Sequence, residues 1–330
     1  MNATDAATPT KARRNVFSLV QSQEATLAVF LVILLAGLAI ATPAFMDPQN
    51  IRDILVNASF PAIAAIGMTL VIISAEIDIS IGAILAVVAV LTGNLALIGV
   101  PIPLVFLIGL IAGTLLGALN GALVAYARIP SIIVTLGALS FWRGLVIYFT
   151  QGAWIYNMPE AFHFAQRSWL GVPIPVWMMA VLVVLAGLFM RFSPLGRQFY
   201  AVGGNRQAAL LAGIPVRRRL FLVFMLNGTF TAIAASIYAS RFSVVQSNAG
   251  LGFEFQVITA VVIGGTSIMG GTGSIWGSFL GAVLMAVIAT GMTFLKVSPY
   301  WLQTVQGSLI LLAVILDVLR RRRAGAAAGP

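Results

Sequence analysis

Long apolar runs separated by short polar breaks occupy almost the whole chain. A membrane-spanning helix needs about 20 predominantly apolar residues, and shorter runs are tolerated where a bundle buries them. The pattern predicts an all-α, polytopic transmembrane helix bundle in one domain, 25–320. Ten runs qualify as spans, and they lie near 25–43, 54–75, 79–99, 103–126, 130–150, 173–191, 217–240, 253–270, 273–296 and 300–319.

The composition excludes a soluble globular protein. Of the 330 residues, 60% are hydrophobic and 8% are charged, whereas roughly a quarter of the residues in soluble domains are charged. Cysteine is absent and His163 is the single histidine, so neither a disulfide nor a metal site is expected. We therefore predict a membrane protein that needs no cofactor.

The basic residues indicate how the chain is oriented. Cytoplasmic loops hold an excess of Lys and Arg, and ten crossings from a cytoplasmic N-terminus place 14 of the 19 basic residues on that side. The net charge of +10 thus indicates orientation rather than nucleic-acid binding. Both termini are predicted to be cytoplasmic, with tails at 1–24 and 321–330. An eight-span alternative, with 79–99 and 130–150 re-entrant, would keep this parity. The 14 positions are Lys11, Arg13, Arg14, Arg128, Arg191, Arg197, Arg206, Arg217, Arg218, Arg219 and 320–323.

A glycine pattern occurs twice, 160 residues apart. The two copies fall in the fourth and ninth runs, which would cross the membrane in opposite directions, as in the inverted repeats of many transporters. Alternatively, glycines at four-residue spacing recur in any tightly packed bundle, because they let helix backbones approach closely. Both interpretations place these residues at helix contacts. They are Gly113, Gly117, Gly121, Gly273, Gly277 and Gly281.

The longest predicted cytoplasmic loop is 193–216. From Asn205 to Ala212 it is expected to form a short helix with Asn205 as N-cap, an apolar face of Ala208, Leu211 and Ala212, and an end at Gly213. Such a helix suits docking on a cytoplasmic partner. The alternative is a solvated anchor loop that holds positive charge inside.

The glycine-rich stretch 264–273 does not resemble a phosphate-binding loop. No Gly-x-x-x-x-Gly-Lys-Ser/Thr motif occurs anywhere in the chain, and no lysine follows the stretch closely enough to reach a phosphate. A sharp helix-to-helix connection is the expected structure. We predict no catalytic residues, so any energy from ATP would come from a partner.

Four charged residues near or within the apolar runs need an explanation. Glu76 and Asp78 follow the second run, and Asp78 is expected to cap the next helix, near its positive end. A proton-coupled carrier would instead use a buried acid of this kind. Glu254 is either a first-turn acid or a docking contact. Arg143, inside a run, is expected to snorkel, pair with an acid or line the path.

Three stretches together resemble the permease family of carbohydrate-uptake ABC transporters, of the ribose-permease type. The first, 67–82, ends in the Ile-Asp-x-Ser-x-Gly pattern at 77–82. The second is 129–137 with Arg143-Gly144. The third runs from 196 through Asn227-Gly228 to 273. The stretch 154–160 is similar to rhamnose and autoinducer-2 permeases. Ala75 departs from the glycine of many relatives.

The resemblance implies a permease in the inner membrane of a bacterium. Its implied partners are a second permease copy, identical or similar, two ATP-binding subunits and a periplasmic sugar-binding protein. It also implies that the 193–216 loop couples ATP hydrolysis to alternating access. The implied coupling residues are Gly196, Arg197, Gly203, Asn205, Arg206, Ala209 and Gly213.

Polar residues within the runs are candidates for the sugar path, because a sugar needs hydrogen bonds at the midplane. Most such residues bond neighbouring helices instead. The competing class is a secondary carrier driven by an ion gradient, which needs an essential midplane acid. A channel lacks support, since no pore-loop motif is present. The path candidates are Asn120, Thr135, Arg143, Asn227 and Gln303.

Overall fold

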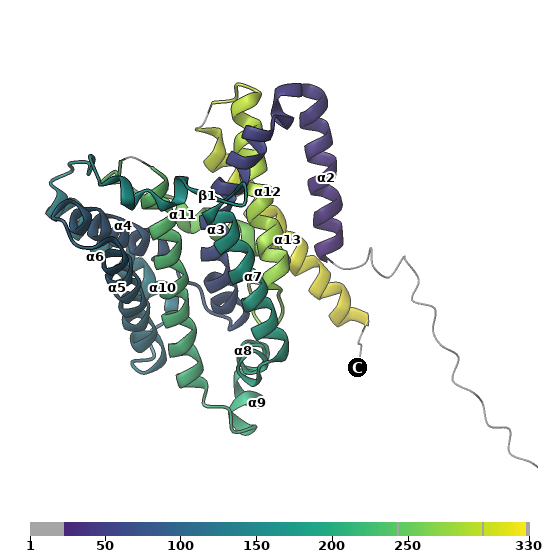
Figure 1. The fold of residues 1–330 in the computed structure, drawn as a ribbon. Coiled ribbons are helices and arrows are strands. Elements are labelled where there is room, and N and C mark those ends of the chain that lie inside the picture. Colours follow the sequence, from purple (N-terminus) through teal and green to yellow (C-terminus); the bar gives the residue numbers. More distant parts are fainter. Residues whose placement is uncertain (1–22, 243, 299, 328–330) are drawn as a thin grey trace, which may run out of the picture.

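The computed structural model describes residues 23–242, 244–298 and 300–327, with side chains described within 24–315. This part of the chain is mostly helical (Figure 1). The α-helices are α2 (Gln23–Ala41), α3 (Pro48–Ile73), α4 (Ile81–Leu97), α5 (Ile102–Ala125), α6 (Ser131–Thr150), α7 (Ile174–Phe192), α8 (Pro194–Gly204), α9 (Arg206–Leu211), α10 (Val216–Arg241), α11 (Phe253–Ile263), α12 (Ile275–Phe294) and α13 (Trp301–Ala327).

Short elements complete the connections. Three 3-10 helices lie at η1 (Pro43–Met46), η2 (Glu160–Phe162) and η3 (Phe164–Gln166). Strands β1 (Ser168–Trp169) and β2 (Val172–Pro173) pair antiparallel in the loop before α7.

Each predicted apolar run corresponds to one helix, so the polytopic helical bundle is confirmed. Seven described helices are long and apolar enough to cross a membrane, namely α2, α3, α5, α6, α7, α10 and α12. The apolar segments 81–97, 253–263 and 301–315 are shorter. The eight-span alternative makes 79–99 and 130–150 re-entrant. The second of these forms α6, which is long enough to cross a membrane, whereas the first forms the shorter helix α4.

Helix α3 forms the centre of the bundle. In its most apolar window 89% of the residues are buried, against 17% to 22% in α2, α5, α6 and α7. The outer helices expose leucine, isoleucine and phenylalanine side chains, as lipid-facing helices do. Gly67 allows the close approach of α3 to α10, because a Cβ there would stand 2.7 Å from the Cα of Asn227.

The helices of the two halves pack in a reciprocal way. Helix α5 packs on α10 and α12 packs on α3, while α4 contacts α10 and α11 contacts α3. The outer neighbours follow the same rule, since α4 contacts α6 and α11 contacts α13. Exchanging α3, α4, α5 and α6 for α10, α11, α12 and α13 therefore reproduces these contacts.

The repeated glycines lie at close helix contacts, but their offset of 160 residues does not align the helices. Gly113 lies in the middle of α5, whereas Gly273 precedes the start of α12. A Cβ at Gly117 would stand 2.8 Å from the Cα of Gly228 in α10, and one at Gly277 would stand 3.0 Å from the carbonyl carbon of Gly264. The glycine motif thus marks packing on different partners, α10 and the end of α11.

Candidate functional site

A fully buried carboxylate, Asp78, lies in the connection between α3 and α4. Its Oδ1 accepts hydrogen bonds from the N–H of Ser80 at 2.9 Å and from the Ser80 hydroxyl at 2.6 Å. Its Oδ2 accepts one from Nδ2 of Asn227 in α10 at 2.9 Å. Asn120 in α5 donates from Nδ2 to the Ser80 Oγ at 2.8 Å. We call these four buried side chains the Asp78 junction.

Asp78 does not have the helix-capping role that the sequence predicts. The N-cap of α4 is Ser80, and its side chain makes no capping hydrogen bond. The Ser80 hydroxyl instead donates to Asp78, which precedes the cap by two residues. Asp78 therefore organises the turn that leads into α4 and joins it to α5 and α10, rather than capping the helix itself. Asn227 Oδ1 is buried without a hydrogen-bond partner among the described residues.

An ion pair links the same connection to the 193–216 segment. Arg206 Nη2 lies 2.6 Å from Glu76 Oε1, with side-chain exposures of 48% and 10%. Beside it, the backbone of Gly203 packs directly on the Ile73 carbonyl at the end of α3. The N–H of Gly271, in the connection from α11 to α12, donates to that carbonyl at 2.8 Å. Three connections thus meet at this end of the bundle.

The 193–216 segment forms two helices where one was predicted. Ser193 caps α8 through the N–H of Gly196, and Asn205 caps α9 through the N–H of Ala208 at 2.9 Å. Gly213, with φ of +78°, follows the end of α9. Figure 1 shows α8 and α9 at one end of the bundle, toward which the start of α2 and the end of α13 also point.

Helix α9 buries one side and exposes the other. Ala209 packs into a cluster with Ala125, Val202, Val216 and Leu220. The exposed fractions of Leu210 and Leu211 are 51% and 83%. The predicted apolar face of Ala208, Leu211 and Ala212 is exposed. An exposed apolar tip of this kind is typical of a binding surface. Of the other predicted coupling residues, Gly196 packs on the Met190 backbone, and Arg197 is exposed and donates to the Phe192 carbonyl at 3.4 Å.

A second buried acid stands at the start of α11. Glu254 has an exposed fraction of 4%, and its Oε2 has no partner among the described residues. The carboxylate lies against Gly82, in the first turn of α4, where no side chain intervenes. Arg143 in α6 donates from Nη1 to the Ala249 carbonyl at 2.6 Å, and its charge interacts with that of Glu254. The Nη2 atom of Arg143 is buried without a hydrogen-bond partner among the described residues.

The remaining path candidates lie apart from the Asp78 junction. Thr135 is buried in α6, and its hydroxyl donates to the Ile132 carbonyl at 3.5 Å. Gln303 is exposed on α13, and its Nε2 lies 3.7 Å from where a Cβ of Gly252 would stand. The structure therefore brings Asn120 and Asn227 together, while Arg143 and Gln303 flank the turn that precedes α11.

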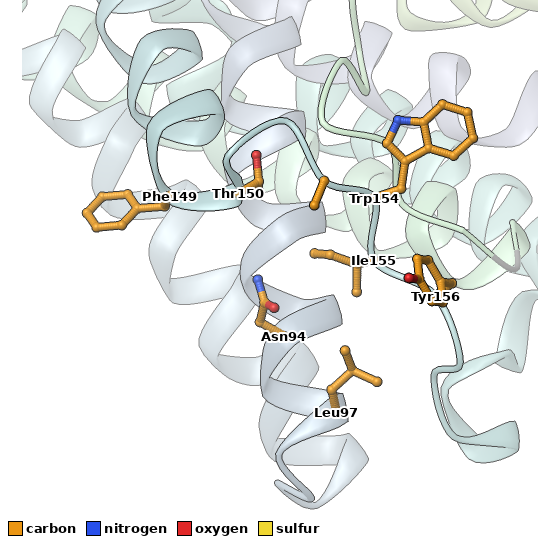
Figure 2. Close-up of a pocket in the computed structure, with 8 residues that line it drawn as sticks. Asn94, Leu97, Phe149, Thr150, Trp154, Ile155 and Tyr156 are labelled. Atoms are coloured by element: carbon orange, nitrogen blue, oxygen red, sulfur yellow. The ribbon is translucent and has the colours of Figure 1, made fainter.

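A small pocket lies at the opposite end from α9. It has a volume of about 270 Å³, and Figure 2 shows it between the end of α4, the end of α6 and the chain that follows α6. Trp154 and Tyr156 at its rim are more than half exposed. The volume is below the roughly 300–1,000 Å³ of typical ligand pockets. His163 in the same loop contacts the Ser240 carbonyl at 3.2 Å. The described residues include no group of three His, Cys, Asp or Glu able to hold a metal ion.

A family model decides the identity of this helical bundle. The model described as "Branched-chain amino acid transport system / permease component" matches residues 50–314. The chain belongs to this family. The match extends from α3 into α13, so the Asp78 junction, the Glu76–Arg206 pair, α8 and α9 all lie within the matched region.

Curated relatives match the permease over nearly its whole length. "Ribose import permease protein RbsC" of Haemophilus influenzae is 36% identical over 294 residues, 88% of this chain and 91% of the relative. The protein of that name from Escherichia coli K12 is 35% identical, covering 94% and 98%. "Autoinducer 2 import system permease protein LsrC" of Photorhabdus luminescens is 31% identical, covering 92% of each. No solved structure matches the chain.

Sequence reasoning missed three features of these sites. The motif 77–82 contains Ser80, but its bond to Asn120 joins residues 40 positions apart. The partners of Glu76 and Arg143 were not predicted either, because neither charge has its partner nearby in sequence. The one available signal was that buried charges are paired.

Proposed function

We propose that this chain is the transmembrane subunit of an ATP-driven ABC importer that carries a monosaccharide across the inner membrane. The observation that carries the proposal is the match, over 94% of this chain and 98% of the relative, to a protein named a ribose import permease. Relatives named for L-arabinose and autoinducer 2 widen the substrate class to small sugars and sugar-like molecules. Catalysis of ATP hydrolysis would belong to a separate subunit.

The proposed topology has ten crossings in 25–320 and both tails, 1–24 and 321–330, in the cytoplasm. The short helices α4 and α11 are mostly buried in the bundle, which relieves them of the need to match the full bilayer thickness. The reciprocal packing of α3–α5 and α10–α12 supports two inverted repeats. The basic clusters at 11–14 and 320–323, which support this orientation, lie outside the residues whose side chains are described.

We assign the coupling role to the segment 193–216. The exposed Leu210 and Leu211 of α9 would dock on the ATP-binding subunit. A displacement of α9 would act on Glu76 through Arg206, and Glu76 lies two residues before Asp78. The Asp78 junction joins that connection to α5 and α10. A push at α9 would therefore reach the two helices that pack most extensively together, which supports alternating access.

The path candidates differ in how well the contacts support them. Arg143 Nη2, Glu254 Oε2 and Asn227 Oδ1 are buried polar atoms without a partner among the described residues. Unpaired buried polar groups are costly, and the hydroxyls of a passing sugar would satisfy them. Asn120 already donates a hydrogen bond to Ser80, so its contacts support a structural role in the Asp78 junction more than a role in sugar binding. Thr135 and Gln303 remain proposals on position alone.

The proposed assembly contains a second permease, identical or similar, two ATP-binding subunits and a periplasmic binding protein. A secondary carrier remains the alternative, because Asp78 and Glu254 are buried acids of the kind that such carriers use. Asp78 accepts three hydrogen bonds, which favours a fixed structural charge over a proton carrier.

Reconstitution tests the proposal directly. The chain would be purified in lipid with its ATP-binding subunit and binding protein, and ATP hydrolysis would be measured across a panel of sugars. Stimulation by one sugar that Arg206→Glu abolishes and Arg218→Glu preserves would support both the function and the coupling segment. Arg218 provides a matched control, because it is an exposed arginine in the first turn of α10. Uptake that continued without the ATP-binding subunit and collapsed with the ion gradient would support the carrier.

A further inference from the structure

The glycine-rich connection 264–273 contacts both the first half of the bundle and the segment 193–216. It joins α11 to α12, as the sequence predicts. The N–H of Gly271 donates to the carbonyl of Ile73, at the end of α3, over a distance of 2.8 Å. A Cβ at Gly271 would stand 2.7 Å from the Cα of Gly204, the last residue of α8. The connection thus lies where the end of α3 meets the end of α8.

These contacts are made largely by the backbone. A Cβ at Gly203 would overlap the carbonyl oxygen of Ile73 and would stand 2.9 Å from the nitrogen of Gly271. A Cβ at Gly270 would stand 2.6 Å from the Cβ of Ala75. Contacts this short leave no space to absorb a displacement, and close-packed regions transmit strain. A movement of α8 would therefore displace the connection as well.

Tyr200 adds a side-chain contact between α8 and the same connection. Its hydroxyl donates to the Gly273 carbonyl at 2.9 Å, and its ring is half-buried. On the same helix Phe199 and Val202 are buried, with exposed fractions of 0% and 1%. Their packing fixes the rotation of α8 about its own axis, and this rotation directs Tyr200 toward the connection. Tyr200 thus links two segments that are 73 positions apart in sequence.

Helix α8 is expected to follow a displacement of α9. Asn205 alone separates the two helices. Its N–H donates to the Ala201 carbonyl of α8 at 3.1 Å, and its side chain accepts from the N–H of Ala208 in α9 at 2.9 Å. A residue that is bonded to both helices joins them into one unit, so a push on α9 would also reach α8.

We propose that Tyr200 is a positioning residue that transmits the movement of the segment 193–216 to the second half of the bundle. Its role rests on the proposed function, since it assumes that the segment is displaced by an ATP-binding subunit. The segment would then have two outputs. Helix α9 acts on the α3–α4 connection through Arg206 and Glu76, and α8 acts on the α11–α12 connection through Tyr200 and Gly273.

Tyr200→Phe tests this role, because it keeps the ring and removes the hydroxyl that donates to the Gly273 carbonyl. The chain in lipid, with its ATP-binding subunit and binding protein, would be assayed for ATP hydrolysis and sugar uptake. We expect the sugar moved per ATP to decrease about fivefold, the change in an equilibrium constant that one typical hydrogen bond supports. Tm should stay nearly unchanged, because water can replace the hydroxyl at a half-buried site. Tyr126→Phe, at an exposed tyrosine after α5, is the matched control and should keep the ratio.

Single-cysteine reporters separate the two outputs, since the chain contains no cysteine. Asn248→Cys reports on the second half from the exposed turn before α11, and Ile98→Cys reports on the first half from the exposed end of α4. Labelling by a maleimide would be followed with and without ATP. Tyr200→Phe should reduce the ATP-dependent change in labelling rate at Asn248→Cys and keep the change at Ile98→Cys. Arg206→Glu should have the opposite effect.

The possible results have distinct meanings. An unchanged ratio of sugar to ATP in Tyr200→Phe would overturn the inference, while sugar-stimulated ATP hydrolysis in the same preparation would leave the proposed function intact. Equal suppression at both reporters would also overturn it, because Tyr200 would then not act on the second half specifically. A decrease in Tm that accounts for the loss of uptake would assign Tyr200 a structural role only. Absence of sugar-stimulated hydrolysis in the unmodified chain would contradict the proposed function itself, and the inference with it.

Discussion

Each half of the bundle contains a buried acid near the start of a short helix, but the two acids differ in their hydrogen bonding. In the first half, Asp78 precedes α4 and both of its carboxylate oxygens accept hydrogen bonds. In the second half, Glu254 lies in the first turn of α11 and its Oε2 has no partner among the described residues. The difference separates a structural charge from one that is available to a substrate.

The surroundings of the two acids explain this difference. Asp78 is held by Ser80 and Asn227, so its negative charge is shared among fixed donors inside the protein. Glu254 forms no ion pair among the described residues; the charge of Arg143, which is only partly buried, acts on it from a distance, and the first turn of α4 lies against it. A fixed network resists change, whereas a pair with unused donor and acceptor atoms can exchange partners.

Asp78→Ala should cause the largest loss of stability. The substitution leaves the Ser80 N–H, the Ser80 hydroxyl and Asn227 Nδ2 without their acceptor inside the bundle. Removing one member of a buried charged network costs about 3 kcal/mol or more. Thermal unfolding in detergent should therefore show a clear decrease in Tm. Glu160→Ala is the control, because Glu160 is exposed and its loss should leave Tm unchanged. An equal Tm for Asp78→Ala and the unmodified chain would contradict the structural role.

Alanine at the close-packed glycines should have the next largest effect. A Cβ at Gly117 would meet the Gly228 backbone, and a Cβ at Gly277 would meet the Gly264 backbone. Overpacking of this kind costs about 1–3 kcal/mol, and leucine should be worse than alanine at both positions. Gly137→Ala in α6 is the control, since nothing lies within 4 Å of its added Cβ. An unchanged Tm for Gly117→Ala or for Gly277→Ala would contradict the close backbone contact at that glycine.

Glu254→Gln should reduce transport more than stability. The substitution keeps the shape of the side chain and removes the charge that balances Arg143. If the unpaired oxygen receives a sugar hydroxyl, transport should decrease about tenfold, since hydrogen bonds to charged groups contribute about 1.5 kcal/mol or more. Uptake into proteoliposomes and Tm would be measured on the same preparation. A decrease in Tm as large as that of Asp78→Ala, without a separate transport defect, would make the two acids equivalent.

The sequence predicts the helices well because lipid imposes a simple pattern. A helix in a bilayer must satisfy its own backbone and present apolar side chains, so each of the ten runs corresponds to a helix. Helix α8 was missed because it contains Pro194 and three glycines, which are poor helix formers. Ser193 can be identified as the N-cap of α8 only when the helix itself is known.

The candidate sites are less predictable because their contacts join distant parts of the chain. Asp78 and Asn227 are 149 positions apart, and Glu76 and Arg206 are 130 positions apart. Local pattern gives the type of residue at each position but not its partner. The capping role predicted for Asp78 illustrates this limit, since the local rule identified the correct helix start and missed the bonds to α5 and α10.

The Glu76–Arg206 pair should have the smallest effect on stability and a specific effect on coupling. Arg206 is 48% exposed, and ion pairs at an exposed partner contribute about 0.5 kcal/mol, so Arg206→Glu should lower Tm only slightly. Glu76 is only 10% exposed, so Glu76→Arg should lower Tm more than Arg206→Glu. Each should nevertheless lower the amount of sugar moved per ATP, because α9 loses its link to the Asp78 junction. The double exchange should restore this ratio, and high salt should weaken the restored link. Coupling that was lost in the single variants and stayed lost in the double variant would show that Arg206 acts on the ATP-binding subunit rather than through Glu76.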